Sequence, residues 1–136
     1  MLQHKFRIKA KDTDFTQRIH YSAIFRYFEE ADYKFFDHIG VSYKSLYAEG
    51  YGTPRVRVEC DYLGAMRFED DIVCDIAISR IGNTSFTYAF DFFSGDNRVA
   101  RGSMTIVFID QTTERPVPIP DFVRKKLEAY VAETTS

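Results

Sequence analysis

Two aspartates stand shortly before an aromatic, helix-forming segment, and of all the residues in the chain they are the best placed to do chemistry. Asp12 and Asp14 flank Thr13, and an apolar helical pattern starts at about Ser22. The first turn of a helix offers unpaired backbone N–H groups and the positive end of the helix dipole. A carboxylate that faces such a donor is arranged to attack an acyl carbonyl while the N–H group stabilises the oxyanion.

The same residues also fit a purely structural role. Asp and Thr are ordinary turn formers, and their side chains hydrogen-bond to nearby backbone groups. A histidine near a helix start, such as His20, caps or packs more often than it acts as a general base or contacts a substrate. His4 and His38 have no partners at ligand spacing, so no metal site is expected.

The elements that must hold these residues follow from hydrophobic periodicity. Alternation predicts a strand over His4–Ala10. A helical stripe predicts a long helix from about Ser22 to Ile39, which Gly40 ends. A short second helix is expected over Val41–Glu49, with Ser42 as its N-cap.

Four further strands should follow, the first over about Arg55–Tyr62. The other three alternate with a period of two, and turns at Gly82-Asn83 and Gly95–Asn97 join them as antiparallel hairpins or a meander. Their apolar faces are Ile72, Cys74, Ile76 and Ile78, then Phe86, Tyr88, Phe90 and Phe92, then Ala100, Gly102, Met104, Ile106 and Phe108.

The C-terminal part is predicted to be a proline-rich connection and a helix. The prolines of Pro116–Pro120 exclude a central strand, because each removes a ladder donor. The helix covers about Asp121–Ala132, and Glu133–Ser136 is expected to fray. The side chains expected to face inward are Phe122, Val123, Leu127, Tyr130 and Val131.

One long helix and one curved antiparallel sheet of about five strands make an α+β fold, here expected as a single domain over residues 1–136. The sheet can wrap the helix. Topology leaves one face open, and we expect a homodimer or homotetramer to close it.

Composition excludes several classes of partner. The net charge is -2, so no basic surface for nucleic acid is implied. No apolar run is long enough to span a bilayer, and the N-terminal residues lack the apolar region of a signal peptide. Cys60 and Cys74 lie in apolar strand patterns without metal-ligand spacing, which predicts reduced thiols in a cytoplasmic protein.

Residues Asp12–Ala31 read Asp-Thr-Asp-Phe-Thr-Gln-Arg-Ile-His-Tyr-Ser-Ala-Ile-Phe-Arg-Tyr-Phe-Glu-Glu-Ala. This segment resembles, without a gap, the motif Asp-Thr-Asp-x-x-Gly-Val-Val-Tyr-His-x-x-Tyr-Leu-Arg-Phe-Phe-Glu-x-Ala of hotdog-fold acyl-CoA thioesterases of the 4-hydroxybenzoyl-CoA thioesterase-like group. Asp61–Asp70 and Pro116–Pro120 resemble further segments of that family. The resemblance implies a hotdog fold, hydrolysis of an acyl- or aryl-CoA thioester, and no cofactor beyond the CoA of the substrate.

The resemblance also implies site residues. The family's catalytic carboxylate falls on Asp14, as nucleophile or general base, and its oxyanion donor falls on the backbone N–H of Tyr21. Asp12 is then a structural neighbour. The expected substrate contacts are His20, Arg18 and Ser85, although Ser85 equally fits a plain hairpin residue. The basic residues that could meet the CoA phosphates, or could simply be solvated, are Arg98, Arg101, Arg124, Lys125 and Lys126.

The chain departs from the family at the same loop. Gln17 stands where the family has Gly, Arg18 replaces a small apolar residue, and His20-Tyr21 stands where the family has Tyr-His. These departures keep a second function open, that of a non-catalytic acyl-CoA binding or sensing module. A hotdog enoyl-CoA hydratase is disfavoured. Such hydratases resemble one another in a shorter Asp-to-His spacing with Asn-Pro between the two residues, and this pattern is absent here.

Overall fold

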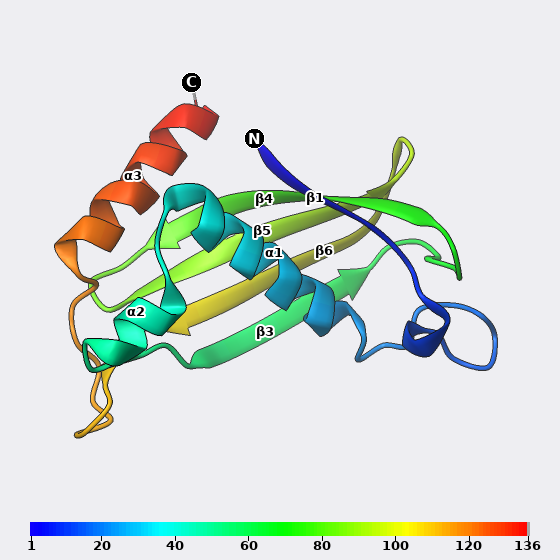
Figure 1. The fold of residues 1–136 in the computed structure, drawn as a ribbon. Helices are drawn as coiled ribbons and strands as arrows, with labels where there is room; N and C mark the ends of the chain where they lie inside the picture. Colours follow the sequence, from blue (N-terminus) through cyan, green and yellow to red (C-terminus); the bar gives the residue numbers. More distant parts are fainter. Residues whose placement is uncertain (136) are drawn as a thin grey trace.

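One antiparallel sheet of five strands curves around a long helix in the computed structural model, which describes residues 1–135 (Figure 1). The strands lie in the order β1-β4-β5-β6-β3, so β1 and β3 form the two edges. Their bounds are Leu2–Arg7 (β1), Arg55–Tyr62 (β3), Asp71–Ile81 (β4), Ser85–Ser94 (β5) and Asn97–Val107 (β6). The expected α+β architecture is thereby confirmed.

The long helix, α1, spans Ile24–Ile39 and lies across the concave side of the sheet (Figure 1). Gly40 ends it in the left-handed conformation, with a φ of 74°, as the sequence predicted. The helix begins two residues later than predicted. The hydroxyl of Ser22, where the predicted helix begins, bonds to His20, and the capping position falls on Ala23.

An aromatic layer fills the space between α1 and the sheet. The predicted inward faces of β4, β5 and β6 are buried, and they meet the buried helix side chains Ile24, Tyr27, Phe28, Ala31, Phe35 and Phe36. Phe28 lies directly on Gly102 of β6. A Cβ atom at Gly102 would lie only 2.1 Å from Cζ of Phe28, so this ring needs a glycine beneath it.

A charged side chain, Asp32, is completely buried within this layer. Its carboxylate accepts hydrogen bonds from the hydroxyls of Tyr43 (2.6 Å) and Tyr88 (2.5 Å) and forms an ion pair with Arg55 (2.5 Å). A buried charge is tolerated only when it is paired and hydrogen-bonded in this way. Burial and the negative charge of Asp32 raise the pKa of Tyr88, so its hydroxyl stays a donor.

Smaller elements cover the rim of the sheet. The second helix, α2 (Tyr43–Ala48), is capped by Ser42, whose side chain accepts the Ser45 N–H at 3.2 Å, as predicted. Residues 10–12 form a short 3₁₀ helix, so β1 ends before Ala10. A two-residue pair, β2 (Tyr51–Gly52) with β7 (Ile109–Asp110), escaped prediction because such short strands show no periodicity.

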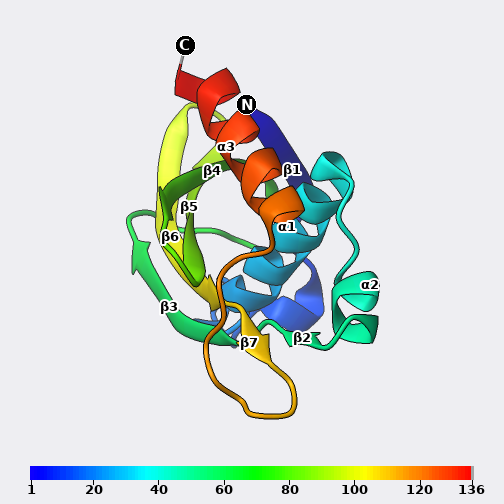
Figure 2. The ribbon, with the colours of Figure 1, turned by 90° about the vertical axis from the view of Figure 1, so that its left-hand side faces the viewer.

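The last helix, α3 (Asp121–Thr135), packs against β4 and lies close to the N-terminus (Figure 2). Val123, Leu127 and Tyr130 face inward, but the prediction was wrong for Phe122, which is 48% exposed. Fraying was also wrong for residues 133–135, because Thr134 and Thr135 donate hydroxyl hydrogen bonds to carbonyls one turn back. Ser136 lies outside the described residues. No helix among the described residues is long and apolar enough to cross a membrane.

Candidate active site

The loop that holds the two aspartates folds back on itself between β1 and α1, at the right of Figure 1. Three antiparallel contacts close it. The His20 N–H donates to the Asp12 carbonyl, and the Asp14 N–H donates to the Arg18 carbonyl. Between these two hydrogen bonds, Thr13 and Ile19 form a β-bridge. One arm therefore carries Asp14, and the other carries His20 into the turn that precedes α1.

The Asp14 carboxylate is held by Thr16. Its Oδ1 accepts both the Thr16 N–H (2.7 Å) and the Thr16 hydroxyl (2.5 Å). The hydrogen bonds from the hydroxyl and then from the N–H of Thr16 lower the pKa of Asp14. Because its pKa is lowered, the carboxylate is ionised at neutral pH. The side chain is half-exposed and therefore accessible.

The Tyr21 N–H is a free donor at the entry to α1. The His20 carbonyl, in the same peptide unit, accepts the Ala23 N–H at 2.9 Å. Because a trans peptide is planar, the Tyr21 N–H points the opposite way, out of the turn. Within residues 1–135 it meets no acceptor. A free backbone N–H of this kind is available as a hydrogen-bond donor to a ligand.

Asp12 is engaged very differently from Asp14. Its side chain is 3% exposed, and its two oxygens accept the Tyr27 hydroxyl (2.6 Å) and the Arg26 guanidinium, both from the first turns of α1. Burial disfavours the charge, but these hydrogen bonds outweigh it, so the pKa of Asp12 lies below its usual value. Asp12 thus ties the start of the loop to the helix.

His20, Tyr21 and Ser22 form a compact cluster beside the free N–H. The His20 ring stacks on the Tyr21 ring at 4.4 Å, and its Nδ1 lies 2.8 Å from the Ser22 hydroxyl and 3.2 Å from the Ser22 N. The Tyr62 hydroxyl, from the edge strand β3, donates to the Tyr21 carbonyl. Sequence reasoning singled out neither Ser22 nor Tyr62, since neither contact has a spacing signal.

Gln17 takes up the left-handed conformation, with a φ of 65°, at the position where the resemblance has glycine. Its carbonyl accepts the Phe68 N–H at 2.9 Å. Arg18 forms an antiparallel backbone β-bridge with Arg67, the residue before Phe68. The loop therefore keeps a glycine-like backbone despite the larger side chain. Arg18 is exposed, on the arm opposite Asp14.

Ser85 does not join this group within one chain. It pairs with Val107 at the start of β5, whereas the loop adjoins Met66 and the Val99 end of β6. Figure 1 shows the two regions at opposite ends of the sheet. Three of the basic residues already have partners: Arg98 pairs with Asp91, Arg101 with Asp61, and Arg124 with the carbonyls of Gly82 and Asn83.

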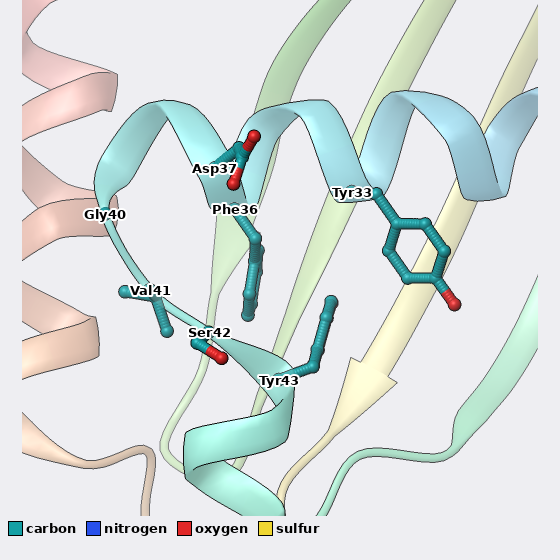
Figure 3. A pocket seen from close by; sticks show the side chains of 7 residues that line it. All are labelled: Tyr33, Phe36, Asp37, Gly40, Val41, Ser42 and Tyr43. Carbon is teal, nitrogen blue, oxygen red and sulfur yellow. The ribbon is translucent and has the colours of Figure 1, made fainter.

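A surface recess of about 400 Å³ lies elsewhere, between the end of α1 and α2 (Figure 3). Its walls include Tyr33, Phe36 and Tyr43, with the Phe36 and Tyr43 rings stacked at 4.0 Å. It contains none of the loop residues, so it is separate from the candidate site.

The curved sheet around one long helix, with a carboxylate loop at the start of that helix, is the architecture of a hotdog protein, as the sequence predicted. The sequence matches the family model of the thioesterase-like superfamily over residues 8–127. The chain belongs to this superfamily.

Known proteins from three organisms are similar to the chain. A protein of Aquifex aeolicus, named as a candidate esterase, is 25% identical over 100 residues, 74% of this chain and 78% of that protein. The 1,4-dihydroxy-2-naphthoyl-CoA thioesterase from Synechocystis has a TM-score of 0.86 at 15% identity, covering 92% and 93% of the two chains. A Staphylococcus aureus protein solved in complex with CoA has a TM-score of 0.89 at 15% identity, covering 96% and 83%. At these identities the structural likeness shows the fold.

Proposed function

We propose that this protein is an acyl-CoA thioesterase that hydrolyses an acyl- or aryl-CoA thioester to the free acid and CoA. The observation that carries the proposal is the free Tyr21 N–H in the same closed loop as the ionised Asp14. Three likenesses support the substrate class: membership of the thioesterase-like superfamily, a structural relative named as a CoA thioesterase, and another solved in complex with CoA.

The reaction divides between these two groups. As the thioester carbonyl is attacked, negative charge develops on its oxygen, and the Tyr21 N–H stabilises it, an effect worth about 2.7–4 kcal/mol in other acyl-transfer enzymes. Asp14 either attacks the carbonyl carbon, giving a mixed anhydride that water hydrolyses, or takes a proton from the attacking water. In both routes the C–S bond breaks and CoA leaves as the thiolate. His20 and Arg18 would contact the substrate beside the reacting carbonyl.

A non-catalytic CoA-ester binding module is the competing function, because Gln17 replaces a glycine in the loop. The left-handed backbone of Gln17 weighs against it, since the loop keeps the conformation that a glycine would give. We therefore favour hydrolysis.

We further propose that the site lies at the interface of a homodimer formed along β3. Among residues 1–135, only β6 pairs with this strand, and Val56, Val58 and Tyr62 are 57%, 43% and 44% exposed. An edge strand with exposed apolar side chains is a template for pairing with another chain. Tyr62 also reaches the Tyr21 carbonyl, so this edge adjoins the proposed oxyanion donor.

The charges of β3 suit an antiparallel partner of the same sequence. Arg57 and Glu59 flank Val58, and both are exposed. If a twofold axis passes Val58, then Arg57 of each copy faces Glu59 of the partner subunit. Opposite charges facing each other across strands stabilise pairing by about 0.2–1 kcal/mol per pair.

Asp14→Asn tests the reaction. Asn keeps an oxygen for the Thr16 hydrogen bonds, so the fold should persist, while kcat should fall at least about 100-fold. Free-thiol release from a panel of aryl-, short-chain and long-chain acyl-CoA esters measures it, and Asp71→Asn, at an exposed surface pair, is the control. Turnover of Asp14→Asn at the wild-type rate would contradict this mechanism. CoA-ester binding without thiol release in the wild type would favour the binding module.

A further inference from the structure

We propose that Ser22 is a positioning residue that holds the neutral His20 imidazole with its proton on Nε2, so that His20 serves the thioester site as a hydrogen-bond donor. The catalytic half of this inference rests on the proposed thioesterase function. The tautomer itself depends only on the contacts around the ring.

The contacts of Nδ1 decide the tautomer. The Ser22 backbone N–H donates to Nδ1 over 3.2 Å, and an amide N–H can only be a donor. Nδ1 must therefore present its lone pair, and the proton of a neutral ring resides on Nε2. The Ser22 hydroxyl, 2.8 Å from the same nitrogen, can rotate to donate as well.

The surroundings also fix the plane of the ring and the backbone that carries it. It stacks on Tyr21 at 4.4 Å with an interplanar angle of 30°. The His20 N–H and carbonyl are both used, by Asp12 and Ala23, so the residue has little freedom to turn. Tyr62 in turn holds the carbonyl of Tyr21, the residue that supports the ring.

This arrangement separates two roles for His20. A general base needs a free lone pair, but the lone pair on Nδ1 is taken by Ser22, and Nε2 carries a proton. The ring can therefore offer its Nε2 N–H to the substrate or to the Asp14 carboxylate. Together with the Tyr21 N–H, it gives the loop a second donor next to the reacting carbonyl.

The first experiment needs no substrate. Long-range ¹H–¹⁵N NMR spectra of the imidazole groups, recorded at about pH 8.5 where histidine side chains are neutral, should show Nδ1 of His20 unprotonated and Nε2 protonated. His20→Ala assigns the signals, and Ser22→Ala, which keeps the backbone N–H that donates to Nδ1, should leave this tautomer in place. A His20 ring protonated on Nδ1 overturns the inference, whatever the fate of the thioesterase proposal.

The second experiment separates donor from base by rescue. The amide of Gln can place an N–H near the position of Nε2 but cannot act as a base at neutral pH. We expect His20→Ala to lower kcat about 100-fold, and His20→Gln to recover most of that loss. Ser22→Ala should lower kcat about 3- to 10-fold with KM unchanged, and should have no further effect in the His20→Gln background.

Two outcomes overturn the donor role: His20→Gln as inactive as His20→Ala, or Ser22→Ala equally harmful in both backgrounds. Asp14→Asn, measured alongside, tests the thioesterase mechanism separately, because a failure there leaves the NMR result on His20 unchanged.

Discussion

Asp12 and Asp14 stand two residues apart, yet their carboxylates have opposite surroundings. Asp12 is buried between Tyr27 and Arg26, whereas Asp14 is half-exposed in the turn that Thr16 closes. The sequence predicts that the two differ through the family resemblance alone, because both are equally good turn formers. The physical basis of the difference is tertiary, since the Asp12 partners come from a helix that starts twelve residues further on.

We predict that Asp12→Asn lowers the free energy of unfolding at pH 7 by about 1–3 kcal/mol, because charge-assisted hydrogen bonds are lost. The pKa of Asp12 is lowered in the folded state, so its contribution is complete above the ordinary carboxyl pKa of about 3.9 and is lost as pH falls further. Urea unfolding of both proteins at pH 7 and at about pH 3 measures the difference, which should shrink at the lower pH.

Asp71→Asn is the matched control, because Asp71 also pairs with an arginine, Arg7, but at the exposed surface. It should cost much less than Asp12→Asn, as surface pairs do. Equal losses in the two variants, or a difference for Asp12→Asn that persists unchanged at low pH, would show that the buried pair does not anchor the loop.

Other residue-level features were beyond sequence reasoning for a similar reason. Asp32 falls on the apolar stripe of α1, four residues after Phe28, but its partners come from α2, β3 and β5. Ser22 was predicted only as the start of the helix, and its hydroxyl bonds to the neighbouring His20 ring. Side chains with several possible partners are assigned only once the fold brings those partners together.

At the scale of elements, α1 and β6 fit each other at one point, where Phe28 rests on Gly102. The periodicities of two and of 3.6 residues were enough to predict β1, β4 to β6 and the buried side of α1. They did not reveal this contact, because a glycine on an apolar strand face has the same pattern as any small residue.

Gly102→Ala should destabilise the protein by about 1–3 kcal/mol, since the new methyl group must displace the Phe28 ring in a packed layer. Thermal or urea unfolding, followed by circular dichroism, measures the change. Ser103→Ala is the control, because Ser103 lies next to Gly102 on β6 and its side chain makes only an exposed hydrogen bond to Glu59. A stability unchanged by Gly102→Ala, or lowered as much by Ser103→Ala, would contradict the close packing.

The whole molecule leaves one edge of its sheet, β3, with exposed apolar and charged side chains. The sequence led us to expect a dimer or tetramer from topology alone. The arrangement of charge about Val58 now gives that expectation a register that can be tested.

We predict that Arg57→Glu and Glu59→Arg each weaken self-association about tenfold or more, because each places like charges opposite each other twice across the twofold axis. An equimolar mixture of the two variants should associate again, since each glutamate then faces an arginine of the other chain. Sedimentation velocity over a concentration series measures all three samples. Unchanged association of the single variants, or no recovery on mixing, would contradict the register.

The packing of Phe28 against Gly102 has one more consequence. The Phe28 ring fills the space above Gly102, so the acyl group of the proposed substrate has no room between α1 and β6 at this point. We therefore expect the acyl group to lie outside this contact, nearer the loop and the free edge of the sheet. Substitutions around the loop and that edge would then be expected to change the preferred substrate without disturbing the packing of Phe28 on Gly102.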